Sequence, residues 1–575
     1  MTSPSRGIVR ISEIVLVVII VAVTGGWLHH WWTELTDPGV QIDDARTHLV
    51  GYHRFDRDPG LTGDPVTGIC MAMQPPFPRL FYRLVTPLTG VPRAAKWAQW
   101  LCVLISLAAA IVLARSPRWG LAAGALLGAL ALAFPWWVGG TPRQFGPPLL
   151  ALYIAGMLAR QYRARFVAAV AAAGTYPSAA ILMLGTECLV ASFRFLKEPW
   201  ALWRPRLVKA VIMVAVCASV AILPKPGADS LGPVITLAEA KTNPDYKDGA
   251  RRLNLTPSSN PVSKSIQEVL FVFGFLRVNP DTKEQAGVMK VAASWLALAA
   301  VGWLTAKRYL QIPAPAVGFF IAGTACYWIA WQMAYRLYIP YRYSEYGIGA
   351  AGTVLIIGLL TRIRLGKRRA WMNRATANFA AAGCLALLWL SWGTSERFSG
   401  TANISRAPRA ALYDFVGSLP KDCRIASHPY DGDDVPFWAA RATLCGYELD
   451  QPFFTRAWHD ALERTRATFG ALYATDPSSV ITFCDRWHVT HLLLRPDRYG
   501  ENFRKRAKYC DPFDAENKRQ LRDIKRGQLV LAHPPETAVV FRDDRFLVVG
   551  VDALRRAWAT EGAKPTVTAG AGAKR

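Results

Sequence analysis

The stretch Ile11–Trp32, ISEIVLVVIIVAVTGGWLHHWW, decides the class of this protein. It is long and apolar enough to cross a bilayer as a helix. Arg6 and Arg10 precede it, and no small-residue cleavage site closes it. We therefore predict an uncleaved first span with a cytoplasmic N-terminus, so that the chain after Trp32 emerges on the exported side.

Similar apolar blocks recur along the chain. Of the 575 residues, 52% are hydrophobic and 19% are charged, which is typical of an integral membrane protein. The region 165–193 fits two short helices broken at Gly174-Thr-Tyr-Pro177, because proline interrupts the hydrogen-bond ladder. Single spans are predicted near residues 95–115, 119–138, 147–160, 207–224, 288–306, 314–334, 346–362 and 375–394. The fold class is therefore a polytopic α-helical membrane protein with about 11 transmembrane helices.

The distribution of charge predicts the topology. The net charge is +26, and the Lys and Arg residues of the short loops all fall on the side of the N-terminus. The positive-inside rule makes that side cytoplasmic in a bacterial inner membrane, and this pattern disfavours nucleic-acid binding. We expect a transmembrane domain over 1–394 with exported loops 33–94 and 225–287. An exported α/β domain over 395–565 and a disordered tail over 566–575 follow.

Loop 33–94 has helical patterns of its own. Asp43–Phe55 fits an amphipathic helix, and Phe77–Leu88 fits a helix lying along the membrane interface. In the exported domain, strands are predicted at Cys423–Ser427, Val489–Leu494, Leu529–Ala532, Ala538–Phe541 and Arg545–Val551, and helices at Ala457–Leu472 and Ser478–Trp487. Disulfides are expected to join Cys423 to Cys445 and Cys484 to Cys510, although spacing does not fix the connectivity.

The segment Gln41-Ile-Asp-Asp-Ala-Arg-Thr-His48 follows the first span. Adjacent carboxylates on a helix point about 100° apart, so one can face a cavity while the other supports it or binds a metal ion. Asp43 or Asp44 could act as a general base, with Asp44 preferred. The alternative is a helix N-cap pair stabilised by the helix dipole. Arg46 and His48 are candidate binding residues beside them.

Two later exported segments carry arginines. Gly139-Gly-Thr-Pro-Arg-Gln-Phe-Gly146 predicts a tight turn that presents Arg143 and Gln144, and Tyr335-Arg-Leu-Tyr-Ile-Pro-Tyr-Arg-Tyr-Ser-Glu345 follows a span. Arginine makes bidentate contacts to phosphate, so both segments are candidates for binding a lipid phosphate. The alternatives are a plain hairpin and an aromatic anchor at the interface. The candidates in the second segment are Arg336, Tyr338, Arg342, Tyr343 and Glu345.

Other motifs limit the classes of function. No Walker loop, dinucleotide fingerprint or Gly-x-Ser-x-Gly elbow occurs, which disfavours ATP-driven transport and serine hydrolysis. In the exported domain, His428, Asp431, Asp433 and Asp434 are expected in a solvated loop, with an acceptor groove as the alternative.

The pattern resembles the C-type membrane glycosyltransferases (GT-C), which include oligosaccharyltransferase catalytic subunits, protein O-mannosyltransferases and lipid A aminoarabinose transferases. In these families an acidic pair follows the first span, as Asp43-Asp44 does here, and interfacial helices and an exported α/β domain come later. The runs Asp-Asp-Ala-Arg-x-His, Gly-Thr-Pro-Arg-Gln-Phe and Arg-Leu-Tyr-Ile-Pro-x-Arg-Tyr also resemble a bacterial group of unassigned function. The Trp-Trp-Asp motif of oligosaccharyltransferases is absent, which disfavours asparagine glycosylation.

The resemblance implies inverting transfer of a sugar from a polyprenyl-phosphate donor to a glycan, lipid or protein acceptor on the exported side. Asp43 or Asp44 would remove the acceptor proton, and Arg143, Arg336 and Arg342 would neutralise the leaving phosphate. The nearest second Asp-x-Asp motif is Asp56-Arg-Asp58, which leaves open a divalent cation, Mg²⁺ or Mn²⁺, at Asp43 and Asp44. Two rival interpretations are a transporter or flippase of lipid-linked sugars and a non-catalytic scaffold in envelope assembly. Transporters commonly carry charges near the bilayer midplane, whereas the polar clusters here lie at one face.

Overall fold

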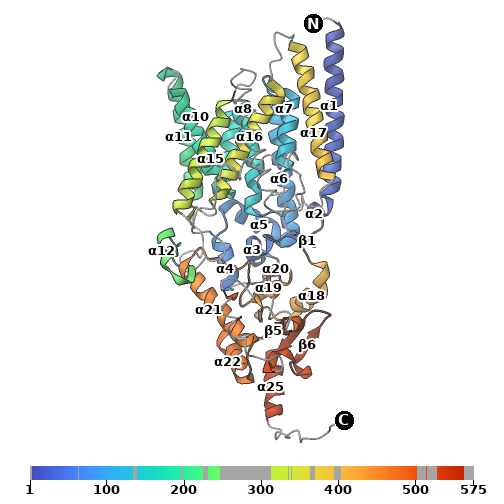
Figure 1. Cartoon of the computed structure of the whole chain (residues 1–575), viewed down its shortest axis with the longest axis vertical. Helices are drawn as coiled ribbons and strands as arrows, with labels where there is room; N and C mark the ends of the chain where they lie inside the picture. The colour runs from blue at the N-terminus through green and yellow to red at the C-terminus, as the bar shows by residue number, and fades with distance from the viewer. Residues whose placement is uncertain are drawn as a thin grey trace.

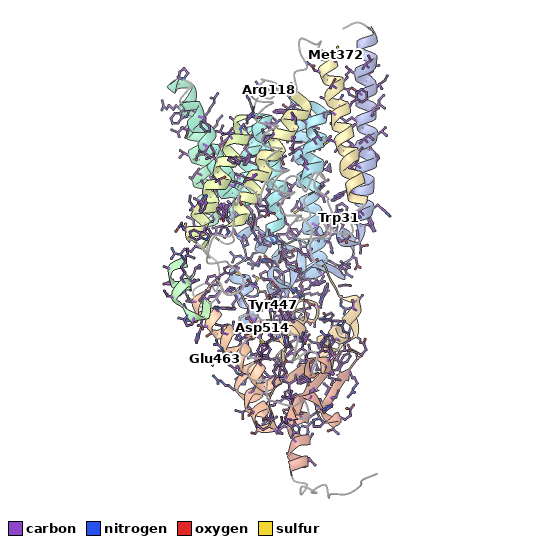
Figure 2. The ribbon with its side chains drawn as sticks, viewed as in Figure 1. Trp31, Arg118, Met372, Tyr447, Glu463 and Asp514 are labelled. Carbon is purple, nitrogen blue, oxygen red and sulfur yellow. The ribbon has the colours of Figure 1, made fainter. Side chains whose placement is uncertain are left out.

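The molecule has a bundle of long helices at one end and a small sheet with its own helices at the other (Figure 1). The computed structural model describes residues 3–61, 64–133, 139–195, 199–223, 231–246, 312–333, 336–337, 340–362, 370–393, 403–500, 513–514, 518 and 528–562. Short helices of residues 32–89 lie between the bundle and the sheet (Figure 1). Side chains of Arg118 and Met372 mark the end of the bundle where the chain starts, and Trp31 marks the end nearer the sheet (Figure 2).

The predicted apolar blocks form helices wherever the structure describes them. They are α1 (Ser3–His30), α6 (Val91–Ala114), α7 (Gly120–Ala133), α8 (Gly146–Leu158), α9 (Tyr162–Thr175), α10 (Pro177–Phe195), α11 (Trp200–Ala221), α15 (Ala314–Met333), α16 (Tyr341–Arg362) and α17 (Ala370–Gly393). Gly7–His30, Val91–Ala114 and Ala314–Met333 are long and apolar enough to cross a membrane. A mostly helical protein with apolar spans is confirmed. The count of spans stays a prediction, and the block near 288–306 lies outside the described residues.

Small residues let neighbouring helices of the bundle pack closely. A β-carbon at Gly347 of α16 would lie 2.5 Å from the Cα atom of Gly323 on α15. A β-carbon at Gly124 of α7 would likewise lie 2.5 Å from the carbonyl oxygen of Ala110 on α6. Without a hydrophobic driving force between helices in lipid, such close backbone contacts supply van der Waals attraction.

The break predicted near Pro177 is present. α9 ends at Thr175, Tyr176 has a non-helical backbone, and α10 starts at Pro177. Proline is tolerated at a helix start because its missing N–H would have no partner there. The break turns the chain around, so that Tyr176 lies where two helices of the bundle end.

The segment between α1 and α6 holds α2 (Trp32–Thr36), β1 (Val40–Ile42), α3 (Ala45–His48), η1 (Val50–Phe55), α4 (Pro65–Ala72) and α5 (Pro76–Thr89). α5 matches the predicted interfacial helix and exposes the row Leu80, Leu84 and Leu88. A single helix over Asp43–Phe55 is wrong, because α3 ends after one turn and continues as the 3₁₀ helix η1. A β-carbon at Gly51 would lie 2.4 Å from Cγ of Met71, so η1 packs tightly on α4.

Strand β1 is held on two sides. It pairs antiparallel with β2 (Asn403–Ser405), which lies on the chain between α17 and the sheet. Lys96 of α6 donates from Nζ to the carbonyl oxygens of Glu34 at 2.7 Å and Val40 at 2.5 Å. The residues that precede Asp43 are therefore tied both to the bundle and to the chain leading into the sheet.

The C-terminal sheet has the strand order β4–β3–β5–β7–β6. β3 is parallel to β4 and β5, whereas β7 is antiparallel to β5 and β6. The strands are β3 (Arg424–Ser427), β4 (Ala442–Thr443), β5 (His491–Leu494), β6 (Val539–Arg542) and β7 (Leu547–Gly550). Its helices include α18 (Ala410–Ser418), α19 (Pro429–Gly432), α20 (Val435–Ala439), α21 (Thr455–Leu472), α22 (Pro477–Trp487) and α25 (Val551–Gly562).

Two predictions about this part of the chain are wrong. Leu529–Ala532 is not a strand, because Val530–Ala532 forms a 3₁₀ turn whose first N–H bonds to the carbonyl of Ala474. Cys423 and Cys445 are both free. β3 and β4 run parallel, and Cys423 precedes β3 whereas Cys445 follows β4, so the two cysteines are at opposite ends of this strand pair. Along the strand direction they are about four residues apart, which corresponds to roughly 13 Å. Cys484 is free and buried, and its predicted partner Cys510, like the tail 566–575, lies outside the described residues.

Candidate functional site

A cavity of ≈ 280 Å³ lies where the bundle meets the C-terminal part of the chain. Its walls come from the α4–α5 junction, η3 (Pro142–Phe145), the α9–α10 break, the start of α16 and the loop before α21. We call it the arginine cavity because three arginines from two separate segments line it. The polar side chains in its wall include Arg143, Arg336, Arg342, His48, Gln74, Tyr176, Tyr343 and Gln451. Five residues predicted to bind substrate thus come together in one place.

A tight turn presents Arg143 to this cavity. Gly140 has φ +71°, and a β-carbon there would lie 2.6 Å from the carbonyl oxygen of Ala95, so only glycine fits. The backbone N–H of Thr141 donates to Oε1 of Gln144 at 2.8 Å, which completes a capping box. Gln144, predicted to bind substrate, is fully buried, does not line the cavity and holds the turn in place.

Asp44 joins the segment that follows α1 to this turn. Its Oδ2 atom lies 2.6 Å from Nη2 of Arg143, and both side chains are mostly buried. Asp44 occupies the N-cap position of α3, but its side chain makes no capping hydrogen bond. The Asp44 carboxylate therefore does not cap the helix, contrary to the alternative interpretation drawn from the sequence. Asp44 does not line the cavity itself and reaches it through Arg143.

Asp43 has a different environment from that of its neighbour. Burial raises the pKa of the Asp43 carboxyl, the charge of Asp44 raises it further, and Arg46 acts in the opposite direction. Within the described residues no ion pair involves Asp43. A carboxylate with a raised pKa is a better proton acceptor while it remains ionised, which is what a general base requires.

The start of α16 supplies the second group of cavity residues. Arg342 is buried and donates from Nη1 to the hydroxyl of Tyr176 at 3.4 Å. Tyr343 donates from its hydroxyl to the carbonyl oxygen of Leu337 at 3.1 Å, which holds the short segment carrying Arg336. Glu345 is half-buried on α16 and is not in the cavity wall, and Tyr338 lies outside the described residues.

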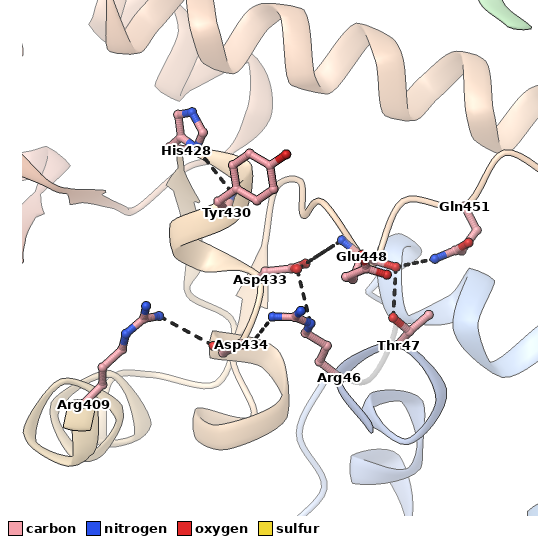
Figure 3. Close-up of polar contacts among 9 residues, drawn as sticks. All are labelled: Arg46, Thr47, Arg409, His428, Tyr430, Asp433, Asp434, Glu448 and Gln451. Carbon is pink, nitrogen blue, oxygen red and sulfur yellow. Dashed lines mark hydrogen bonds and ion pairs between the residues drawn. The ribbon is translucent and has the colours of Figure 1, made fainter. Parts of the chain in front are cut away.

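Arg46, predicted to bind substrate, contacts the C-terminal part of the chain instead of the cavity. Its Nη1 atom lies 2.8 Å from Oδ1 of Asp434, and its Nε atom lies 3.5 Å from Oδ2 of Asp433 (Figure 3). The neighbouring Thr47 donates to the carbonyl oxygen of Glu448 at 3.0 Å. We call these contacts the Arg46 junction.

The expectation of a solvated loop around residues 428–434 is wrong. His428, Asp431 and Asp433 are all buried, because the loop packs between the sheet and α3. Asp431 accepts two hydrogen bonds from Arg498, at 2.5 and 2.8 Å. Desolvated carboxylates need such partners, and here arginines provide them.

Several wall residues were absent from the predicted set. Tyr176 stands in the break before Pro177, and that break was the signal that could have singled it out. Phe453 and Phe454 form apolar wall in the loop before α21, and nothing in the local sequence distinguishes them from core aromatics. Gln74 accepts a hydrogen bond from the hydroxyl of buried Tyr52 at 3.2 Å.

The residues around Asp43 and Asp44 do not fit a metal ion well. No group of three or more His, Cys, Asp or Glu side chains that could hold a metal occurs in the part of the chain that the structure describes. Arg143 already neutralises Asp44 at 2.6 Å. A hard divalent cation would require several free oxygen ligands at the same place.

Comparisons with solved structures find chains similar to this one along most of its length. ArnT from Cupriavidus metallidurans bound to undecaprenyl phosphate is 17% identical, with a TM-score of 0.45, over 93% of this chain and 98% of that one. The Archaeoglobus fulgidus oligosaccharyltransferase in complex with Zn and sulfate is 11% identical, with a TM-score of 0.42, over 86% of this chain and 70% of that one. AglB from Archaeoglobus fulgidus, in complex with an inhibitory peptide and a dolichol-phosphate, is 11% identical, with a TM-score of 0.40, over 87% and 71%. No family model and no curated protein matches the sequence.

The Arg46 junction predicts a stability effect. Replacing Arg46 by Met leaves the buried Asp433 and part-buried Asp434 without this cation, so we expect a loss of about 3 kcal/mol in unfolding free energy. The midpoint of thermal unfolding of the full chain in detergent measures the loss, and trypsin should cut the C-terminal part faster.

The matched control is Arg486→Met. Arg486 pairs with Glu463, but their side chains are 65% and 46% exposed, so less than about 1 kcal/mol should be lost. Equal effects of the two substitutions would contradict a special role for the Arg46 junction.

Proposed function

We propose that this protein is a membrane glycosyltransferase that moves a sugar from a polyprenyl-phosphate donor to an acceptor on the exported side. One observation carries the proposal: Arg143 and the pair Arg336 and Arg342, which come from two separate segments, line a single cavity, and Asp44 contacts Arg143. The predictions from the sequence placed these residues on one side of the membrane. Their convergence supports a shared ligand.

The charge of the arginine cavity suits a phosphate. The residues that line it include three arginines and no carboxylate among the described side chains. When the sugar leaves its carrier, negative charge develops on the phosphate oxygen. Fixed guanidinium groups stabilise such charge without having to reorganise during the reaction.

The size of the cavity suits the headgroup of the donor. Its ≈ 280 Å³ lies near the lower end of the range of ligand pockets, which is about 300–1,000 Å³. A phosphate with its sugar fits that space, whereas a long prenyl chain needs surface outside it. α5 starts at Pro76, directly after the wall residue Pro75, and its exposed leucine row offers an apolar surface for the chain.

We assign the base role to Asp43 and an orienting role to Asp44. The acceptor's O–H or N–H proton moves to Asp43 as the acceptor atom bonds to the anomeric carbon. The bond from that carbon to the phosphate oxygen breaks, its electron pair stays on the phosphate, and the configuration inverts. Neither Asp43 nor Asp44 lines the cavity itself. The ion pair of Asp44 with Arg143, with no ion pair at Asp43 among the described residues, supports this division, and the raised pKa of Asp43 is consistent with it. This assignment departs from the preference for Asp44 drawn from sequence alone.

The C-terminal part, taken as the exported domain over 395–565, contributes Gln451, Phe453 and Phe454 to the cavity wall. This supports a role in closing the site and in binding the acceptor. No metal ion has a step in the proposed reaction. Transport of lipid-linked sugars and a non-catalytic scaffold remain rivals that the experiments below separate from transfer.

The arginine cavity predicts how the donor carrier binds. Arg342→Ala and Arg336→Ala should each weaken binding of undecaprenyl phosphate by about tenfold, since a hydrogen bond to a charged group is worth about 1.5–3 kcal/mol. Native mass spectrometry of the full chain in detergent measures the bound fraction. Arg83→Ala, on the exposed side of α5 and outside the cavity, is the control. Undecaprenol, which lacks the phosphate, should not distinguish the variants, and equal undecaprenyl phosphate binding by all three would remove the phosphate role.

The base role predicts a loss of transfer in Asp43→Asn. The amide cannot accept the proton, so the rate should fall by about 10²-fold or more. Transfer is measured as label moved from a crude pool of radiolabelled polyprenyl-phosphate sugars, with envelope glycans profiled by mass spectrometry. Asp58→Asn is the control, because that side chain is 83% exposed. If Asp43→Asn and Asp44→Asn both insert normally and leave every glycan unchanged, the enzyme hypothesis fails.

The environment of Asp43 predicts the pH dependence. The base works when ionised, so activity should fall as the pH drops through its pKa, and that midpoint should lie above the ordinary Asp value of about 3.9. Asp44→Asn removes a negative charge that raises the pKa of Asp43. The residual activity of this variant should therefore show its acid midpoint at lower pH. An unchanged or higher midpoint would contradict Asp43 as the titrating group.

A further inference from the structure

A second cavity, of ≈ 330 Å³, lies among α8, α9, α10 and α11. It is separate from the arginine cavity, and the proposed transfer reaction does not use it. We call it the α8–α11 cavity. Its polar wall residues are Arg160, Tyr162, Arg165, Glu187, Arg206 and Lys209.

The two cavities lie at opposite ends of the same helices. α8 starts at Gly146, beside Arg143, and ends at Leu158, beside Arg160. Its thirteen residues rise by about 1.5 Å each, so roughly 20 Å separates the two ends. The α8–α11 cavity is therefore at the end of the bundle where α1 starts, away from the sheet (Figure 1).

Positive charge dominates this cavity. Its wall has four cationic side chains and one carboxylate. That carboxylate, Glu187, already accepts hydrogen bonds from Arg165 at 2.6 and 2.8 Å and from the Tyr153 hydroxyl at 2.8 Å. Arg160, Arg206 and Lys209 are exposed, so the excess positive charge is on the accessible side.

Polar contacts between helices build the cavity. Tyr162 of α9 donates from its hydroxyl to the carbonyl oxygen of Lys209 on α11 at 2.9 Å. The Lys209 ammonium and the Arg165 guanidinium lie 5.5 and 5.6 Å from the centre of the same tyrosine ring. Trp203 of α11 donates to the carbonyl oxygen of Ala191 on α10 at 3.1 Å. The cations are thus held around a defined space.

The backbone at Arg160 points to a role for its side chain. Arg160 has φ +60°, a left-handed conformation that favours glycine. It stands just beyond α8, where the N–H of Gln161 bonds back to Gly156 at 2.8 Å, as in a Schellman motif. Glycine would suit this backbone conformation better than arginine. The presence of arginine therefore indicates that its guanidinium group has a role beyond folding.

The surroundings indicate a lipid ligand. Val208, Val211 and Ile212 of α11 expose apolar side chains next to Arg206 and Lys209. Cations at the end of a membrane helix, flanked by apolar surface, lie at the depth of lipid headgroups. A soluble anion would make no use of that apolar surface.

We propose that the α8–α11 cavity binds the phosphate headgroup of an anionic phospholipid, in the leaflet opposite the proposed transfer site. The acyl chains lie along the exposed side chains of α11. Basic residues in such loops also orient spans during insertion, but orientation requires only charge in the loop and no cavity.

The test uses the full chain in nanodiscs of phosphatidylcholine with and without phosphatidylglycerol. Native mass spectrometry after release measures how much phosphatidylglycerol stays bound. Arg160→Gly should reduce its retention about fivefold, which corresponds to about 1 kcal/mol per cation near a lipid surface. The same variant should keep or raise the thermal midpoint, because it relieves the left-handed backbone. Loss of retention then cannot be attributed to unfolding.

The control is Arg163→Gln, which removes one positive charge from an exposed residue at the start of α9 that does not line the cavity. It should retain phosphatidylglycerol like the unchanged protein, and Arg206→Gln with Lys209→Gln should lose more than Arg160→Gly. Equal retention by Arg160→Gly and Arg163→Gln would overturn the proposal. If inorganic phosphate in phosphatidylcholine discs raises the thermal midpoint as much as phosphatidylglycerol does, the cavity is a soluble-anion site and the lipid assignment is wrong.

Discussion

The ion pairs of Arg46 with Asp433 and Asp434 constrain the whole arrangement. Charges removed from water must meet a partner, so this junction fixes how α3 lies against the C-terminal part. With α3 held, Asp44 extends to the other side and pairs with Arg143 in the turn before α8. Arg46 of α3 and Asp44 just before it thus connect the C-terminal part to the helical bundle. The arginine cavity lies where these two parts meet.

The sequence predicted the helices well, because apolar blocks of spanning length form helices over almost any tertiary background. The break at Tyr176 followed from proline chemistry, and the strands β3, β5, β6 and β7 from their apolar runs. Short apolar runs have no such clear signal, so the 3₁₀ turn at Val530–Ala532 was mistaken for a strand. The pairing of β1 with β2 joins segments that precede and follow most of the bundle helices in the sequence, and no local pattern encodes it.

The sequence predicted which charged residues belong to the candidate site, but not which residues they contact. Topology grouped Arg143, Arg336 and Arg342 on one side, and the structure brings them into one cavity. The partners of individual side chains depend on long-range packing. For that reason Gln144 holds a turn, Arg46 contacts the C-terminal part, and Phe453 and Phe454 could not be told from ordinary core residues.

The wall of the arginine cavity draws on residues from η3 and α16 and from the loop before α21, far later in the chain. A chain still being synthesised can have all three arginines but lack Phe453 and Phe454, which complete the cavity wall. The cavity therefore becomes complete only after the loop before α21 has been synthesised and has packed against η3 and α16. An unfinished chain therefore cannot enclose a ligand between these segments before its C-terminal part has folded.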